Sequence, residues 1–228
     1  MFNDMNLDGY TAERFVSTWT PVENPPTPSG TGAKRVFDIA GALLLLVIGA
    51  PVLAFIALLI KLTSAGPVLF CQPRIGLNGA VFCCYKFRTM AASAADLLAE
   101  KQTVPGDPRI TAVGRWLRKL SFDEMPQLLN VLRGEMSLVG PRPHAPATKA
   151  DGRLFADVVP GYHRRHVVRP GITGLAQVSG CRGPTGQAEQ ILRRVHFDLV
   201  YIERMSFRLD LQILWTTATR EIFSDQAF

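Results

Sequence analysis

Two adjacent carboxylates, Asp123 and Glu124, precede a proline in the stretch SFDEMPQLLNVLRGEMSLVGPRP, residues 121–143. Ser121 and Glu124 fit a helix capping box, in which the Glu124 side chain would bind only the backbone of Ser121. Pro126 argues against so early a helix start, because a proline beyond the first turn removes a hydrogen bond that the helix needs. We therefore expect the helix to begin at Asp123 or just after it, with both carboxylates ionised at the positive end of the helix dipole.

Ionised carboxylates suit nucleophilic chemistry better than general acid catalysis, which requires a raised pKa. An ionised Asp123 beside a metal-binding Glu124 could attack phosphorus. A divalent cation such as Mg²⁺, held by both carboxylates, would offset their mutual repulsion. By spacing alone, an acid pair before a helix is more often a plain helix terminus than a catalytic pair.

Basic residues in stiff or extended segments accompany the acid pair. Arg142 lies between two prolines, which suits bidentate binding of phosphate oxygens. Lys86 and Arg88 alternate along an extended stretch and so should point to one side. Arg74 and Arg169 lie in turns bounded by Pro and Gly. Each alone is more often a surface cation, but together they predict a phosphate-binding pocket.

An apolar segment without charge covers residues 39–60 and contains Pro51 near its middle. As a helix it would reach roughly 33 Å, against a hydrocarbon core of about 30 Å. A kinked spanning helix and a re-entrant hairpin that enters and leaves on one face both fit this pattern. A buried core helix fits its length less well.

Basic residues are unevenly spread along the 228-residue chain, whose net charge is +6. Residues 140–208 hold eleven Arg or Lys and five Asp or Glu. Beside an apolar segment, this excess favours anionic lipid or a phosphorylated substrate as partner over nucleic acid. The four cysteines lack zinc spacing, and we expect no disulfide framework, which indicates chemistry on the cytoplasmic side.

Residue patterns predict an α-rich α+β fold with a small β element. Two short strands should lie within residues 67–90, around a turn at Leu77-Asn78-Gly79. Helical patterns cover residues 91–100, 111–120, 187–204 and 209–223. The last of these contains Trp215 and is either a core helix or an amphipathic helix in the membrane interface.

Several motifs in one order resemble the bacterial sugar transferases, which are monotopic polyprenyl-phosphate phosphoglycosyl transferases. The resemblance covers about residues 34–223 and rests on KRVFDIAGA, GPVLFCQPRIG, YKFRTM, FDEMPQLLNVLRGEMSLVGPRP, RPGITGLAQVSG and FDLVYIERMSFRLDLQIL. It implies a compact form with a disordered tail and Pro-rich linker (residues 1–33), and a re-entrant helix-break-helix hairpin broken at Pro51 (residues 34–64). A cytoplasmic catalytic domain with interfacial amphipathic helices would follow (residues 65–228).

The resemblance also implies a two-step reaction at the bacterial inner membrane. Asp123 would attack the β-phosphate of a UDP-sugar and release UMP, and polyprenyl (undecaprenyl) phosphate would then take the phosphosugar to start exopolysaccharide or glycoconjugate assembly. Glu124 would bind Mg²⁺ or assist the lipid phosphate, while Arg142, Lys86 and Arg88 would hold phosphates. Weaker site candidates are Glu135, Asp198 and Tyr201. A homodimer is compatible with this interpretation, and the transferred sugar stays open.

Two other functions fit parts of the pattern less well. A non-catalytic, membrane-anchored module that binds anionic ligands would have no use for paired carboxylates. An aspartyl-phosphate phosphatase would carry a D-x-D-x-T motif, which the sequence lacks.

Overall fold

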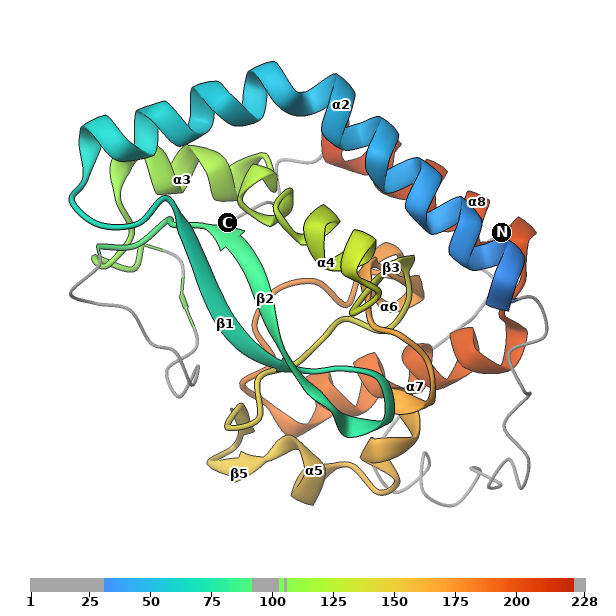
Figure 1. Ribbon diagram of the computed structural model, residues 1–228. Helices are drawn as coiled ribbons and strands as arrows, with labels where there is room; N and C mark the ends of the chain where they lie inside the picture. Colours follow the sequence, from blue (N-terminus) through green and yellow to red (C-terminus); the bar gives the residue numbers. More distant parts are fainter. Residues whose placement is uncertain (1–30, 92–102, 105, 224–228) are drawn as a thin grey trace.

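The computed structural model describes residues 31–91, 103–104 and 106–223 (Figure 1). In this part of the chain, helices surround three two-stranded sheets, which agrees with the predicted helix-rich fold. The predicted tail at 1–33 lies outside the described residues except for its last three. The helix predicted at 91–100 lies outside them except for Ala91.

The apolar segment forms α2 (Thr31–Thr63), which the sequence analysis expected to be broken at Pro51. The helix instead runs continuously through Pro51 and bends in its middle (Figure 1). Proline permits this because its φ suits a helix and it deletes only one backbone hydrogen bond. Among the described residues, α2 is the one helix long and apolar enough to cross a membrane, and only 11% of its most apolar window is buried. That exposure excludes a buried core helix.

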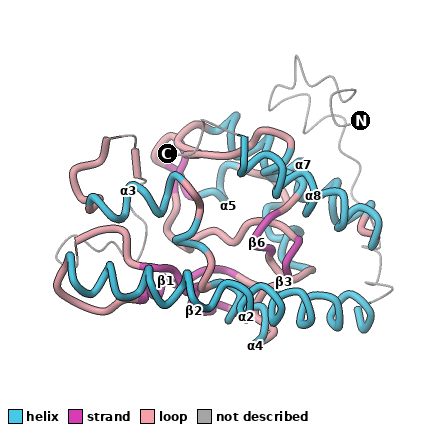
Figure 2. The backbone as a smooth tube through the Cα atoms, turned by 90° about the horizontal axis from the view of Figure 1, so that it is seen from above, coloured by secondary structure: helices cyan, strands magenta, loops and turns pink. Residues whose placement is uncertain are grey.

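Both ends of α2 are attached to the same folded body. Near the start, Asp38 accepts hydrogen bonds from Ser137 Oγ (2.8 Å) and from the Leu138 amide (3.0 Å). Near the end, Ile60 is buried in a cluster that includes Phe87. Figure 2 shows α2 along one side of the molecule, with the neighbouring hairpin and α4 (Gln127–Arg133) next to it. Because α2 bends, its first and last turns both contact the same folded domain.

The predicted hairpin is confirmed as β1 (Leu69–Ile75) paired antiparallel with β2 (Val81–Phe87). Its turn places Asn78 and Gly79 at positive φ, the conformation that these two residue types tolerate best. The sequence analysis expected no disulfide framework and did not foresee the one disulfide of the structure, which joins Cys71 and Cys83 across the hairpin. Cys83 pairs with Pro73, so the hairpin register makes Cys71 its diagonal neighbour. The cysteines thus give no support to a cytoplasmic location.

The acid pair follows the predicted helix at 111–120, confirmed as α3 (Ala112–Lys119). The pair itself lies in a 3₁₀ turn, η3 (Phe122–Glu124), and α4 begins only after Pro126. The capping-box alternative is wrong, because Ser121 adopts a left-handed conformation and its side chain caps nothing. The helix also starts later than expected, so the carboxylates precede α4 by a full turn.

A short parallel pair lies at the centre, formed by β3 (Ser137–Val139) and β6 (Gly171–Thr173). The backbones of the loops after these two strands lie very close to each other. A side chain at Gly174 would not fit, because its Cβ would lie 2.2 Å from the Gly140 carbonyl oxygen. The remaining short elements are β4 (Lys149–Ala150), β5 (Arg153–Leu154), α5 (Phe155–Val158), η4 (Tyr162–Val167) and α6 (Leu175–Val178).

The two C-terminal helical patterns are confirmed as α7 (Ala188–Arg204) and α8 (Phe207–Phe223). Helix α7 is central to the main core, to which it contributes Ile191, Val195, Phe197 and Tyr201. One face of α8 packs on the main core through Ile213, which is fully buried, so the core interpretation is confirmed for that face. On another side, the exposed fraction of Trp215 is 74%, and its position in the membrane interface stays a prediction.

Candidate active site

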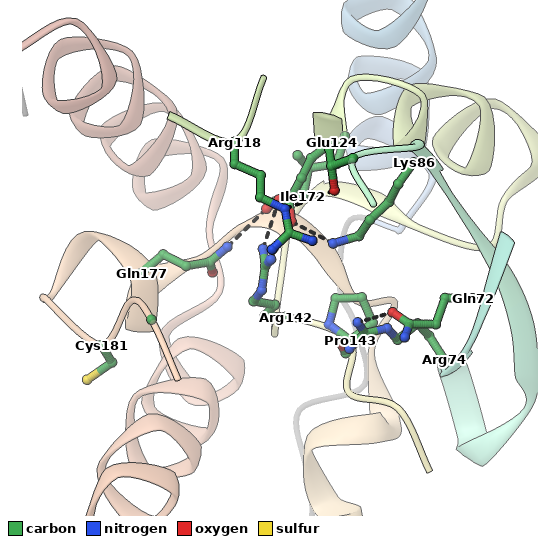
Figure 3. A network of polar contacts seen from close by, with 12 residues as sticks. Gln72, Arg74, Lys86, Arg118, Glu124, Arg142, Pro143, Ile172, Gln177 and Cys181 are labelled. Carbon is green, nitrogen blue, oxygen red and sulfur yellow. Dashed lines mark hydrogen bonds and ion pairs between the residues drawn. The ribbon is translucent and has the colours of Figure 1, made fainter. Parts of the chain in front are cut away.

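Glu124 is clamped by two cations from different parts of the fold (Figure 3). Lys86, near the end of β2, donates to Glu124 Oε1 at 2.9 Å. Arg142, in the loop after β3, donates from Nη1 to Oε2 at 2.9 Å and from Nη2 to Oε1. This two-pronged geometry is the strongest that a guanidinium makes with a carboxylate. Lys86 and Arg142, two of the residues predicted to bind phosphate, thus lie against Glu124, and their binding of phosphate stays a prediction.

The surroundings of Asp123 differ from those of Glu124. Its side chain is 8% exposed, yet within the described part of the chain it has no hydrogen-bond or ion-pair partner. Its carboxylate oxygens are not completely closed off from solvent. The Asp123 carboxylate is therefore held in place by its turn while its oxygens remain available for chemistry.

The two carboxyl groups titrate in opposite directions. Burial, and next the charge of Glu124, raise the pKa of Asp123 to about 6. Burial also tends to raise the pKa of Glu124, but the charges of Arg142 and Lys86 together hold the pKa of that carboxyl well below its usual range. The expectation that the site favours the charged form of both acids is wrong for Asp123, because the sequence does not reveal burial. At pH 7, a group with a pKa of about 6 is still roughly nine-tenths ionised.

Arg118 of α3 joins this site, although the sequence analysis did not select it as a site residue. Its Nε donates to Thr89 Oγ1 at 2.9 Å, and its guanidinium faces the same space as the guanidinium of Arg142 and the ammonium of Lys86 (Figure 3). Burial lowers the pKa of Arg118, and the charge of Asp123 opposes that shift. No pattern in the sequence separates Arg118 from Arg115, because only the turn after α3 decides which cation faces the acids.

Arg74 lies on the other side of Arg142, as predicted for a member of the site. Its Nη1 donates to the Pro143 carbonyl at 3.1 Å, and its Nη2 donates to Gln72. Its Nε is buried and has no partner among the described residues. Burial lowers the pKa of Arg74, and Arg142 and Glu124 are close enough to act on it.

Two other predicted phosphate-binding residues are engaged elsewhere. The Arg88 guanidinium donates to the Ser64 carbonyl (2.8 Å) and Ser64 Oγ (2.7 Å) after the end of α2. Arg169 donates to the Gly134 carbonyl behind α4 at 2.8 Å. The expected alternation of Lys86 and Arg88 toward one ligand is wrong, because Arg88 follows the end of β2 and binds the partly buried Ser64 after the end of α2.

Asp198 supports the site from behind. It accepts hydrogen bonds from Arg165 Nε (2.9 Å) and Nη2 (2.7 Å), and both side chains are buried. The same Arg165 Nη2 donates to the Arg142 carbonyl, and Nη1 lies 3.0 Å from His144 Nδ1. Arg165, which the sequence analysis did not select, therefore holds the backbone of Arg142.

Tyr201 and Glu135 have structural partners. Tyr201 donates to Asp210 (2.7 Å) and lies 3.1 Å from the Val139 carbonyl oxygen, so it joins α7, α8 and β3. Glu135 accepts a hydrogen bond of 2.6 Å from the buried Asn130. Neither residue contacts the acid pair.

The acid pair is also the expected metal site. Among the described residues, no group of three or more His, Cys, Asp or Glu side chains could hold a metal ion. Two adjacent carboxylates still fit Mg²⁺, which commonly takes one or two protein carboxylates and completes its shell with substrate phosphates and water.

Comparison with known proteins explains why these residues are assembled. A family model described as bacterial sugar transferase matches residues 30–224. The chain belongs to the bacterial sugar transferase family. The family predicted from the motifs is thereby confirmed.

Among relatives of this sugar transferase, an undecaprenyl-phosphate glucose phosphotransferase from Komagataeibacter xylinus is 54% identical over 86% of this chain and 37% of its own length. The exopolysaccharide production protein PSS from Rhizobium leguminosarum bv. phaseoli is 48% identical over 86% of this chain and 98% of its length. A UDP-glucose:undecaprenyl-phosphate glucose-1-phosphate transferase from Escherichia coli (strain K12) is 45% identical. The chain spans 41% of that relative and 37% of the first.

Proposed function

We propose that this sugar transferase moves a sugar 1-phosphate from a UDP-sugar to undecaprenyl phosphate through a covalent intermediate on Asp123, and so starts exopolysaccharide or glycoconjugate assembly. UDP-glucose is the proposed donor, since five of the relatives carry glucose and undecaprenyl phosphate in their names. One observation carries the proposal: the Asp123 carboxylate is buried and has no partner among the described residues, beside a glutamate held by two cations.

In the first step, an Asp123 oxygen attacks the β-phosphorus, a new O–P bond forms, and the bond to the leaving UMP oxygen breaks. In the second step, an oxygen of the lipid phosphate attacks the same phosphorus, and the Asp123 carboxylate leaves unchanged. Lys86, Arg118 and Arg142 neutralise the phosphoryl oxygens in both steps, which is the main requirement of phosphoryl transfer.

Mg²⁺ is proposed to bind with the donor diphosphate, held by Asp123 and Glu124. When bound, it neutralises charge on the diphosphate and the leaving group. Chelation of divalent cations should abolish UMP release, and added Mg²⁺ should restore it. Full turnover in chelator would refute the requirement.

We further propose that α2 enters the membrane and returns on the same face, with the domain at residues 65–228 on the cytoplasmic side of the inner membrane. Both ends of α2 bind one folded body, and its flanks carry Lys34, Arg35 and Lys61. A cysteine placed at exposed Val36 or exposed Lys61 should react with an impermeant maleimide from the same side of a sealed vesicle. Labelling from opposite sides would indicate a spanning helix.

Mass spectrometry of the full chain mixed with UDP-glucose, without lipid phosphate, tests the covalent step. The expected result is a glucose-phosphate adduct on the peptide that contains Asp123, lost in Asp123→Asn and retained in the control Asp157→Asn, which changes an exposed acid. An adduct on another residue, or none, would overturn the mechanism. Donor binding without UMP release would instead support a non-catalytic anion-binding module.

A further inference from the structure

Arg194 of α7 is a buried cation that none of the sequence motifs singled out. Its side chain is 6% exposed, and its Nη2 donates to the carbonyl oxygens of Cys181 and Gly183, both at 2.9 Å. No described carboxylate forms an ion pair with it. Its Nε and Nη1 have no hydrogen-bond partner in the described chain, and neither atom is completely closed off from solvent. Three N–H groups of Arg194 thus remain available to a ligand.

The charges around Arg194 make an anion the natural partner. Burial, and next the charge of Arg142, lower the pKa of Arg194 to about 10, against the opposing effect of Asp198. Charged side chains of this region include six cations and three carboxylates: Arg74, Lys86, Arg118, Arg142, Arg165, Arg194, Asp123, Glu124 and Asp198. Arg165 and Arg194 are buried and the other four cations are partly buried, so this excess of three positive charges is costly unless a ligand supplies negative charge.

The position of Arg194 relates it to the proposed reaction centre. In Figure 3, Cys181 lies across Arg142 from Glu124, and it is the Cys181 carbonyl that holds the Arg194 guanidinium. Arg142 follows β3, and α6 with the turn at 181–183 follows β6. Both loops therefore leave the carboxyl ends of a parallel strand pair, where ligands of α/β sheets usually bind.

We propose that Arg194 forms a second phosphate subsite, for the donor phosphate that leaves as UMP, while Lys86, Arg118 and Arg142 hold the phosphate that is attacked. This inference rests on the proposed function. A diphosphate needs two neighbouring cationic positions, and Arg142 joins them because it is close to both Glu124 and Arg194. A purely structural clamp for the 181–183 turn would need only the two bonds from Nη2.

The decisive variant is Arg194→Gln, with Arg193→Gln as its matched control. Arg193 is the preceding residue of α7, is exposed, and loses the same charge. UMP binding to the full chain in detergent, measured by calorimetry, should weaken about tenfold or more in Arg194→Gln, because charge-assisted hydrogen bonds are lost. Arg193→Gln should bind like the wild type. Arg194→Lys, which keeps the charge but not the planar fork, should lie between them.

Uridine provides the internal check, since it lacks the phosphate. Arg194→Gln should bind uridine as the wild type does; if it does not fold, Arg194→Lys carries the same comparison. Equal UMP affinity in Arg194→Gln and Arg193→Gln would overturn the subsite. So would unchanged UMP binding with slower transfer to undecaprenyl phosphate, which would assign Arg194 to the lipid phosphate.

The proposed function and this subsite fail separately. UMP binding is an equilibrium that needs no bond to Asp123. A missing Asp123 adduct together with Arg194-dependent UMP binding would overturn only the covalent mechanism. An intact adduct together with Arg194-independent UMP binding would overturn only the subsite.

Discussion

Arg165 donates a hydrogen bond of 2.6 Å from Nη2 to the carbonyl oxygen of Arg142. The same guanidinium is paired with buried Asp198, so an acid on α7 determines where the loop after β3 can lie. The side chain of Arg142 then reaches Glu124 from a backbone that is held from behind. Glu124 is therefore positioned through Arg142 by Arg165, two contacts away, and by Asp198, three contacts away.

Asp198→Asn should lower activity as well as stability. The change leaves Arg165 buried without a full counter-charge, at a cost of up to about 3–5 kcal/mol, and loosens the backbone of Arg142. We expect UMP release at a temperature where the variant is folded to fall about tenfold.

Tyr201→Phe is the matched control for Asp198→Asn, because it removes buried hydrogen bonds from α7 without touching Arg165. It should cost about 1–3 kcal/mol of stability and leave the rate of the folded enzyme unchanged. Equal rate losses in the two variants would mean that Asp198 acts on the fold alone.

The rate of the first step should fall with pH through the pKa of Asp123, which is about 6. The nucleophile must be ionised, so the burst of UMP release should be half-maximal near pH 6 and drop roughly tenfold per pH unit below it. Rapid-quench assays between pH 5 and 8 measure this limb. A burst that stays constant down to pH 5 would show that another group, or an unshifted carboxylate, attacks.

In Glu124→Gln, the fall in the rate of UMP release on the acid side of the pH profile should occur at a lower pH than in the wild type. The charge of Glu124 raises the pKa of Asp123, while Lys86 and Arg142 lower it, so removing the Glu124 charge shifts the balance toward the ionised form. We also expect a rate loss of about ten- to a hundredfold, because Arg142 loses its anchor. Glu135→Gln, which alters an acid outside the site, should leave the limb in place. A fall in rate that occurs at a higher pH in Glu124→Gln than in the wild type would contradict the effect of the Glu124 charge on the pKa of Asp123.

Asp123→Asn should be more stable than the wild type at pH 7.5. The folded-state pKa of Asp123 is about 6 against an ordinary value of 3.8, so the folded protein favours the protonated form. The ionised carboxylate is therefore destabilising above pH 6, and this effect disappears as the pH falls below 3.8. Thermal unfolding should show a gain of at least about 2 °C at pH 7.5, narrowing toward pH 4. A variant that melts lower at pH 7.5 would mean that Asp123 has a stabilising partner.

Local patterns were enough to predict several elements and the acid pair. The hairpin followed from Asn78-Gly79 between β-forming runs, and α3, α7 and α8 followed from apolar spacing, because turn chemistry and helix periodicity act between near neighbours. The family motifs added Arg142 and Lys86, which the structure brings to Glu124.

Burial and the direction of each cation depended on contacts between distant parts of the chain. The sequence grouped Arg88 with Lys86, but Arg88 binds Ser64 after α2, 24 residues earlier. It selected neither Arg118 nor Arg194, although the fold buries Arg194 and places Arg118 near Asp123.

The sequence by itself thus determined which chemical groups are present, the local elements that carry them and the family to which the chain belongs. Only the tertiary structure decided which carboxylate is free, which arginines surround it and where α2 returns to the body. The physical reason is that charge, hydrogen bonding and desolvation depend on neighbours in space, and here those neighbours are 18 to 100 residues apart along the chain.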